Sequence, residues 1–204
     1  MKVKPSKGEL KRQRDVLRRY ERFLPTLQLK KQQLQMEVLH QVILLEEKKQ
    51  LIAKKLSQIE SWVGLLSGEK IKIREFLDIE EVVTEHKNIA GVDIPVFSQV
   101  RFVTEEYDLF LTPIWLDSAL DAFKEILWLQ EEARIIEQGI VLLRQELRIA
   151  TQRVNLFEKV KIPEAQEAIR IIKIYIGDQM ANSVGRSKIA KRKIEEYVSA
   201  GAAV

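Results

Sequence analysis

Two apolar rows with heptad spacing, one toward each end of the chain, constrain the fold more than any other feature. The first row recurs every seventh residue and has one polar member, at Leu10, Leu17, Leu24, Lys31, Val38, Leu45, Ile52 and Ile59. The second row alternates steps of three and four without a polar member, at Ile126, Leu129, Ala133, Ile136, Ile140, Leu143, Leu147, Ala150, Val154 and Phe157. Such rows form the seam of a coiled coil, so the sequence predicts two long helices that pair in antiparallel fashion.

The segment between the two rows predicts a β-hairpin. Apolar side chains fall on alternate positions, with Ser98 as the polar exception, at Val92, Ile94, Val96, Val100 and Phe102. A period of two is typical of a strand. Residues 79–89 are the expected partner strand, with a turn at Ala90–Gly91. Pro95 cannot donate a hydrogen bond to a neighbouring strand, which favours an edge position.

We therefore expect a mainly α fold, in which the N- and C-terminal helices form a long antiparallel two-helix coiled coil around a small central region with a β-hairpin and short helices. The expected parts are an N-terminal helix over residues 1–63 with a kink near Pro25, a central region over 64–112 with its hairpin at about 79–103, a C-terminal helix over 113–198 with a break or kink near Pro163, and a disordered tail over 199–204. Ser6 and Glu9 have the spacing of a capping box, which predicts the start of the first helix.

The net charge of +4 conceals a strong segregation of charge along the chain. Residues 1–31 carry a net +8, residues 69–137 a net −9 and residues 138–204 a net +5. Segregated charge suggests different partners at the two ends of the fold. From charge alone, the basic ends are open to three interpretations: binding to a nucleic-acid backbone, docking into an acidic protein cavity, or a solvated charged face.

The sequence contains no recognisable catalytic or ligand-binding motif. Neither GxxxxGK[ST] nor GxGxxG occurs, and the chain has no cysteine for a disulfide or a thiolate metal site. His40 and His86 belong to different expected elements, so a dyad or metal pair is not expected. We expect no cofactor, no metal and no enzymatic activity. No apolar run is long enough to span a membrane, and the opening MKVKPSKGEL lacks the apolar core of a signal peptide, so we expect a cytosolic chain.

Four stretches carry a family resemblance that covers essentially the whole chain. They are residues 27–34 (LQLKKQQL), residues 91–95 (GVDIP), residues 153–158 (RVNLFE) followed by Ile162-Pro163, and residues 188–194 (KIAKRKI). In this order they resemble the segments L-L-K-x-K-x-x-x-L, G-V-x-[VI]-P, RVNxxE…IP and K-x-K-x-K-I of the D-subunit family of V-type and A-type rotary ATPases. The RVNxxE…IP signature is the most specific of the four.

The resemblance implies the central shaft of a rotor, which couples ATP hydrolysis or synthesis to rotation and to proton or sodium translocation through a membrane ring. The implied partners are the A and B subunits of the catalytic head, the small F subunit of the rotor, and the C subunit that forms a socket above the ring. The shaft itself would bind no nucleotide, perform no chemistry and lie on the cytoplasmic side of the membrane in the soluble sector. The alternatives are a basic coiled coil that binds nucleic acid, for which aromatic residues near the basic cluster are few, and a self-associating helical adaptor.

The resemblance also implies roles for individual residues. Contact with the catalytic head at the shaft tip is expected from Arg12, Arg14, Arg18, Arg19, Lys188, Lys191, Arg192 and Lys193. The family signature on the shaft comprises Arg153, Val154, Asn155, Phe157, Glu158, Ile162 and Pro163, with Phe157 in the seam. The end that meets the small subunit and the socket is expected to include Val92, Ile94, Pro95 and Trp115. Pro25 departs from the uninterrupted helix that is commoner in the family.

Overall fold

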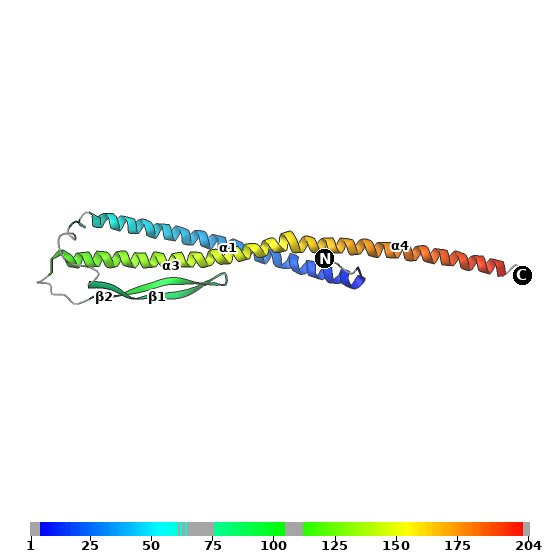
Figure 1. Cartoon of the computed structure of the whole chain (residues 1–204), viewed down its shortest axis with the longest axis horizontal. Coiled ribbons are helices and arrows are strands. Elements are labelled where there is room, and N and C mark those ends of the chain that lie inside the picture. The colour runs from blue at the N-terminus through cyan, green and yellow to red at the C-terminus, as the bar shows by residue number, and fades with distance from the viewer. Residues whose placement is uncertain (1–4, 61, 63, 65–75, 105–111, 202–204) are drawn as a thin grey trace. The chain divides into compact units, whose positions relative to one another are not determined.

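The computed structural model describes residues 5–60, 62, 64, 76–104 and 112–201. Its elements are α1 (Lys7–Glu60), β1 (Leu77–Ile89), β2 (Val92–Thr104), α3 (Trp115–Leu156), the π-helical turn η2 (Phe157–Lys161) and α4 (Ile162–Gly201) (Figure 1). The expected mainly α fold, with long helices at both ends of the chain and an antiparallel hairpin between them, is confirmed. The chain forms two compact units, unit 1 from Met1–Gln28 and Gln152–Val204, and unit 2 from Leu29–Thr151.

Several details of the expected boundaries can be placed on these elements. Helix α1 contains Pro25 in its interior and continues on both sides of it. Helix α4 includes residues 199–201, which the sequence assigned to a disordered tail, and 202–204 lie outside the described residues. The short helices expected in the central region fall largely on residues 65–75 and 105–111, which also lie outside the described residues.

The hairpin of unit 2 is closed by a two-residue turn. Ile89 pairs with Val92, and the ladder continues to Leu77 opposite Thr104. Both turn residues have positive φ, 52° at Ala90 and 78° at Gly91. This pattern is that of a type I′ turn, whose twist matches that of the flanking strands. The predicted turn position and strand pairing are therefore confirmed.

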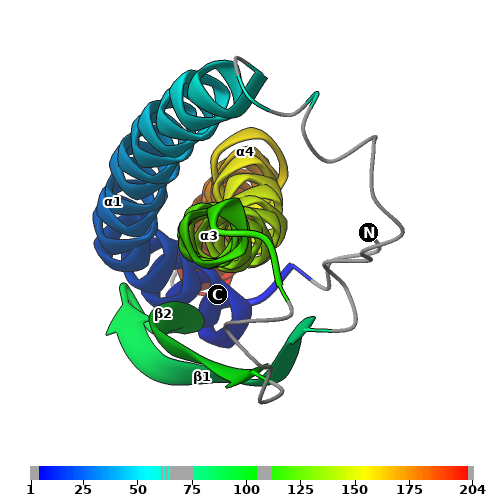
Figure 2. The same ribbon diagram turned by 90° about the vertical axis from the view of Figure 1, so that its left-hand side faces the viewer.

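The inward face of β2 is buried against the helices of unit 2. Val92 is 8% exposed and Ile94 is 1% exposed, and both pack in one cluster with Leu34 of α1 and Leu143 of α3. The hairpin lies directly alongside α3 in both views (Figures 1 and 2). Gly139 of α3 faces this strand, and a Cβ there would lie in ordinary van der Waals contact, 3.8 Å from the Pro95 carbonyl oxygen and 3.9 Å from Ile94 Cβ.

Within unit 2, α1 and α3 are antiparallel, as their ion pairs show. Lys48 Nζ lies 2.8 Å from Glu132 Oε2 and Lys55 Nζ lies 2.7 Å from Glu125 Oε1, so rising numbers in α1 meet falling numbers in α3. The Lys55–Glu125 pair is exposed, and an exposed ion pair contributes little to stability. The apolar seam carries most of it, and the members of the second row that are buried in this unit are Ile126, Leu129, Ala133, Ile140, Leu143 and Ala150.

A second apolar cluster joins the start of α3 to the open end of the hairpin. Leu77 of β1 is buried with Leu116 and Leu120 of α3, and Phe102 and Trp115 pack against them. Because the hairpin is held to α3 at both of its ends, it is a fixed part of unit 2 and not a free two-stranded arm, which would be marginal alone.

Trp128 joins three elements of unit 2. Its ring makes an edge-to-face contact with Phe97 of β2 at 5.1 Å between centroids. Lys48 Nζ of α1 lies 5.7 Å from the centroid of the same indole. This cation–π contact adds to the ion pair that Lys48 makes with Glu132.

Unit 1 is a helix pair formed by the first turns of α1 and the chain from residue 152 onward. Its buried side chains are on the C-terminal partner and include Val154, Ala165, Ile169 and Ile172. Tyr20 of α1 packs its ring edge-to-face on Phe157, with 5.2 Å between the centroids. Helix α4 extends past the first residues of α1, so its C-terminal half has no described helix beside it (Figure 1).

Candidate interaction surfaces

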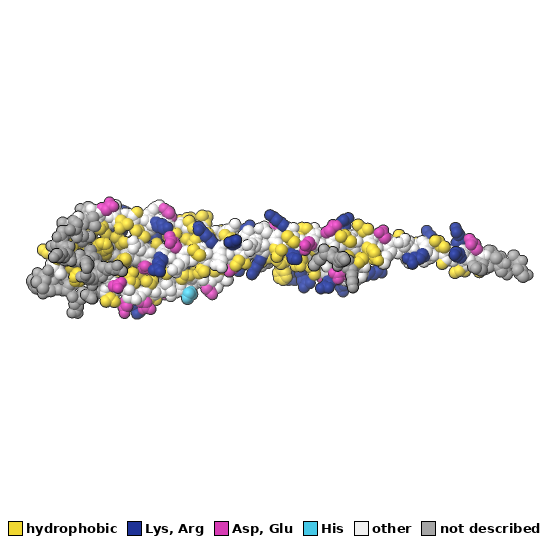
Figure 3. Space-filling model, viewed as in Figure 1, with side chains coloured by type: hydrophobic (Ala, Val, Ile, Leu, Met, Phe, Trp, Pro, Cys, Tyr) yellow, Lys and Arg dark blue, Asp and Glu magenta, His cyan; other side chains and the backbone are white. Residues whose placement is uncertain are grey.

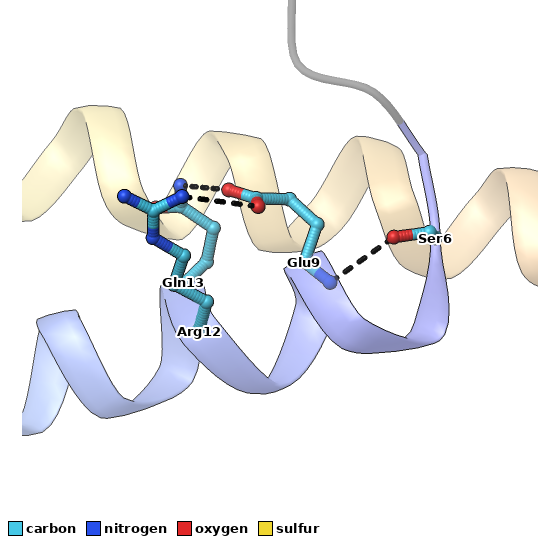
Figure 4. A network of polar contacts seen from close by, with 4 residues as sticks. All are labelled: Ser6, Glu9, Arg12 and Gln13. Carbon is cyan, nitrogen blue, oxygen red and sulfur yellow. Dashed lines mark hydrogen bonds and ion pairs between the residues drawn. The ribbon is translucent and has the colours of Figure 1, made fainter.

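The first helix begins with a Ser6 cap that orders the basic turns after it. The Glu9 backbone N–H donates to Ser6 Oγ at 3.1 Å (Figure 4). The Leu10 N–H donates to the Ser6 carbonyl at 2.9 Å. The Glu9 carboxylate does not close the box: it accepts a hydrogen bond from Gln13 Nε2 at 2.8 Å and lies 3.9 Å from an Arg12 nitrogen. An acidic group in the first turn also favours the positive end of the helix dipole. The predicted helix start is thus confirmed, with half of the capping box formed.

Two sets of basic side chains lie exposed in unit 1. The set on α1 comprises Arg12, Arg14, Arg18 and Arg19, and the set on α4 comprises Lys188, Lys191, Arg192 and Lys193. Lys191 lies 3.7 Å from Glu195 and Arg192 lies 3.5 Å from Glu196, both in exposed pairs one helical turn apart. Among the described residues, Arg14, Arg18, Arg19, Lys188 and Lys193 make no ion pair. Most of this positive charge is therefore available to an acidic partner.

The two units differ in the sign of their net charge. Unit 1 carries 19 Lys and Arg against 9 Asp and Glu, a net +10, while unit 2 carries 15 against 21, a net −6. Lys and Arg side chains gather over the first turns of α1 and the end of α4 on the visible face (Figure 3). The segregation predicted from the sequence therefore follows the boundaries of the two units.

Apolar side chains accompany the basic ones on the unpaired half of α4. Ile172 is the last buried residue among the α4 side chains that the structure describes, and beyond it Met180, Val184, Ile189 and Ile194 are each more than half exposed. Glu167 and Arg170 lie just before this stretch and form a two-bond contact, in which Arg170 holds the pKa of the Glu167 carboxyl below its usual range. This half of α4 combines positive charge with apolar side chains that the described chain leaves uncovered.

The seven signature residues divide into inward and outward sets. Val154 is buried, while Phe157 and Ile162 are half-buried. The predicted position of Phe157 in the seam agrees with its contact on Tyr20. The outward set, in which every side chain is exposed, comprises Arg153, Asn155, Glu158 and Pro163. The inward residues fix the helix pair, and the outward ones are accessible from solution.

The signature also contains the π-helical turn, which lies just before Pro163, where the sequence predicts a break or kink but not the π geometry. The Ile162 N–H donates to the Phe157 carbonyl, one residue farther back than in an α-helix. The apolar row shows the same extra residue, since Phe157 and Ile162 are five apart, while steps of three and four resume at Ala165, Ile169 and Ile172. The spacing of the row was the signal that could have predicted this turn.

The residues expected at the small-subunit end lie mainly inside the chain's own core. Val92 and Ile94 are buried against α1 and α3, Pro95 is half-buried, and Trp115 packs in the second cluster. Their side chains hold the hairpin in place. A role of this end in binding another subunit stays a prediction, and it would fall to neighbouring exposed residues.

Helix α1 also has an outward apolar face, which the two apolar rows did not predict. Leu29, Met36 and Ile43 are seven residues apart, and Leu39 lies beside them. Each is at least half exposed, with Met36 at 73%. The seven-residue spacing of these residues, out of phase with the buried row, was visible in the sequence.

Neither a metal cluster nor a membrane span is found within the described ranges. Three or more His, Cys, Asp or Glu side chains suited to a metal ion do not come together there. Among the helices of the same ranges, none is both long and apolar enough to cross a bilayer.

The family model of the ATP synthase D subunit matches residues 9–192, which is most of the chain. The chain belongs to the ATP synthase D-subunit family. Three relatives, each named as the D subunit of a V-type ATP synthase, support this. The protein of Borreliella burgdorferi is 42% identical over 95% of this chain and 95% of its own length. The protein of Chlamydia pneumoniae is 34% identical over 96% and 94%, and that of Chlamydia trachomatis serovar L2 is 32% identical over 96% and 97%.

The match to the D-subunit family spans both units and the connections within them. It begins three residues before Arg12 and ends at Arg192, so it includes the outward signature residues and nearly all of the basic residues named above. The resemblance noted from four short stretches is therefore shown for the chain as a whole.

Proposed function

We propose that this chain is the central rotor shaft of a V-type ATP synthase, coupling ATP hydrolysis or synthesis in a catalytic head to rotation and to proton or sodium translocation through a membrane ring. The observation that carries the proposal is the full-length similarity to D subunits of V-type ATP synthases, with 42% identity over 95% of both chains in one relative. A shaft must transmit torque without slipping, and the buried apolar seam of paired helices suits that task.

The tip that enters the head is assigned to unit 1. Its net charge of +10 and its unpaired arginines and lysines suit a cavity with acidic walls. The apolar side chains on the unpaired half of α4, among them Met180 and Val184, would pack against apolar parts of the same cavity. The head would consist of A and B subunits, as the family resemblance implies.

Unit 2 is assigned to the opposite set of partners, the small F subunit of the rotor and the C subunit of the socket. Its net charge of −6 offers a surface unlike that of unit 1. Val92 and Ile94 would act there by fixing the hairpin, since both are buried. In this role the chain binds no nucleotide and performs no chemistry itself, and it lies in the soluble sector on the cytoplasmic side of the membrane.

Coupling follows from the asymmetry of a single shaft inside a head with threefold symmetry. Each orientation of the shaft favours a different arrangement of open and closed catalytic sites. ATP turnover changes which arrangement is stable and so turns the shaft, and ion flow through the ring would drive the same steps in reverse. Linkage requires this reciprocity, because each catalytic site and the ring bias the orientation of the same shaft.

The stoichiometry of the assembled complex tests the proposal. The chain is co-expressed with the head subunits and the small subunit from its own operon, and the purified assembly is weighed by native mass spectrometry. One copy of the chain per three head pairs is expected, since a single axial element breaks threefold symmetry in this way. Two or more copies, or no association, would overturn the proposal. If the chain does not associate with the head subunits and instead shows salt-sensitive binding to DNA or RNA, the result would favour a nucleic-acid-binding coiled coil.

A further inference from the structure

The helical run from Trp115 to Gly201 departs from α geometry at the turn Phe157–Lys161. The Ile162 N–H bonds to the Phe157 carbonyl in place of the Glu158 carbonyl. Pro163 follows directly and has no N–H to donate. Two successive positions therefore lack the usual α-helical hydrogen bond, which weakens the backbone at this level.

The facing part of α1 is also loosely held. Tyr20 packs on Phe157, and Pro25, five residues farther along α1, removes another backbone donor. The buried residues of α1, Leu34 and Ile59, both lie outside unit 1. The two helices of unit 1 thus carry backbone interruptions within about two turns of each other, where α1 contributes only half-buried side chains.

The spacing of the apolar row requires the π turn, because the row contains one step of five residues at this position. An α-helical path from Phe157 would rotate all later residues by about 100° around the helix axis. Ile169 and Ile172, which are 8% and 0% exposed, would then leave the seam and expose their side chains to water. The π turn therefore keeps the later apolar residues in the seam.

We propose that this π turn is the torsionally soft point of unit 1, where the helix pair twists under load and returns when the load is released. Bends in helices concentrate at prolines and π turns, and both occur here together. The edge-to-face contact of Tyr20 with Phe157 tolerates a small rotation, because it imposes no hydrogen-bond geometry. The consequence for rotary coupling, elastic storage of torque between catalytic steps, rests on the proposed function.

Hydrogen exchange of the full-length chain, free and in the purified complex, tests the soft point without assuming rotation. Backbone amides of residues 158–162 are expected to exchange roughly tenfold faster than those of residues 144–153 and 164–172. Equal protection across these three segments would overturn the proposal. Loss of the predicted stoichiometry in the complex would contradict the rotor function alone, since the exchange pattern of the free chain still decides the softness.

A matched pair of variants tests the mechanical consequence in the assembled complex. Deletion of Lys159 combined with Pro163→Ala changes the five-residue step into four, so an unbroken α-helix then keeps the seam in line. The control is Pro163→Ala alone, which keeps the five-residue step. In single-molecule recordings of a stalled rotor, the deletion variant is expected to show a roughly twofold smaller angular variance than the control. Equal variances in the two variants would overturn the proposal.

Discussion

Ala90 is the one residue other than glycine with a positive φ among the described residues. A left-handed conformation costs an L-amino acid about 1–2 kcal/mol, and type I′ turns usually avoid it with Asn or Gly. We expect Ala90→Gly to raise the free energy of unfolding by about 0.5–1 kcal/mol, because the relief of strain exceeds the added entropy of the unfolded chain. Urea denaturation of the full chain measures the change.

The same substitution in a helix provides the control for Ala90. Ala53 is exposed within α1, where alanine is the favoured residue. Ala53→Gly should lower the free energy of unfolding by about 0.5–1 kcal/mol. If both variants lose stability, the positive φ of Ala90 stores no strain and the explanation is wrong.

Gly139 lies where α3 contacts the hairpin. A Cβ at this position would make ordinary contacts, the nearest at 3.8 Å from the Pro95 carbonyl oxygen. We expect Gly139→Ala to stabilise the fold by about 0.5–1 kcal/mol through helix propensity. The larger Gly139→Leu should destabilise it by about 1–3 kcal/mol, because the added atoms collide with β2. Thermal denaturation of the two variants, compared with the parent, separates the effects, and equal behaviour of the two would contradict a close approach here.

At the scale of elements, periodicity predicted what depends on a repeated apolar pattern. The row from Ile126 to Ala150 is buried or half-buried as expected, and the alternation around Val92 and Ile94 located β2 and its inward face. These features are predictable because burial of apolar area dominates the choice of face. The Ser6 cap followed from a local side-chain-to-backbone bond, which also needs no tertiary information.

The features that the sequence did not predict depend on how two separate parts of the chain relate to each other. The π turn required a comparison of the row before Phe157 with the row after Ile162, and each row alone looks regular. Similarly, the alternating pattern at Val92 and Ile94 is the same for a strand covered by another subunit as for a strand covered by the chain itself. Their burial against Leu34 and Leu143 could be known only once the hairpin was placed on the helices.

The cause of the π turn can be tested at Pro163. If the proline ring alone forced the turn, removing it would restore an α-helix; if the five-residue step of the apolar row forces it, the turn persists. We expect Pro163→Ala to retain the hydrogen bond from the Ile162 N–H to the Phe157 carbonyl, with a change in unfolding free energy below about 1 kcal/mol. A crystal structure of the variant checks this. A bond from Ile162 to Glu158 would show that the proline is the cause.

Across the chain, buried apolar residues stabilise the fold, while exposed charged residues are available to partners. Unit 1 is basic and unit 2 is acidic, so a partner surface whose charge attracts one unit repels the other. The sequence showed this segregation through simple counting. It could not assign partner contacts to single side chains, because an exposed arginine such as Arg14 or Arg18 has no contact within the chain from which a role could be derived.

Truncation of the end of α4 should weaken coupling while leaving the stability of the chain nearly unchanged. The side chains of residues 186–196 are all exposed, so truncation before Arg186 removes no buried side chain from this stretch. We expect the free energy of unfolding to change by less than about 0.5 kcal/mol. Coupling in the assembled complex should weaken by roughly 1 kcal/mol, about fivefold in the ratio of ions moved to ATP hydrolysed, because the tip would lose directional contacts with the head.

A charge variant distinguishes the sign of the tip from its length. In the full-length chain, Lys188, Lys191, Arg192 and Lys193 are replaced together by alanine, which keeps the helix and removes the basic set. If acidic walls of the head hold the tip, this variant should reproduce most of the truncation's effect on coupling, and the parent complex should lose coupling as salt rises. Full ion-coupled turnover in the truncated complex would show that unit 1 does not act through this end. Normal coupling in the alanine variant alone would instead assign the contact to the apolar side chains such as Ile189 and Ile194, which remain in place.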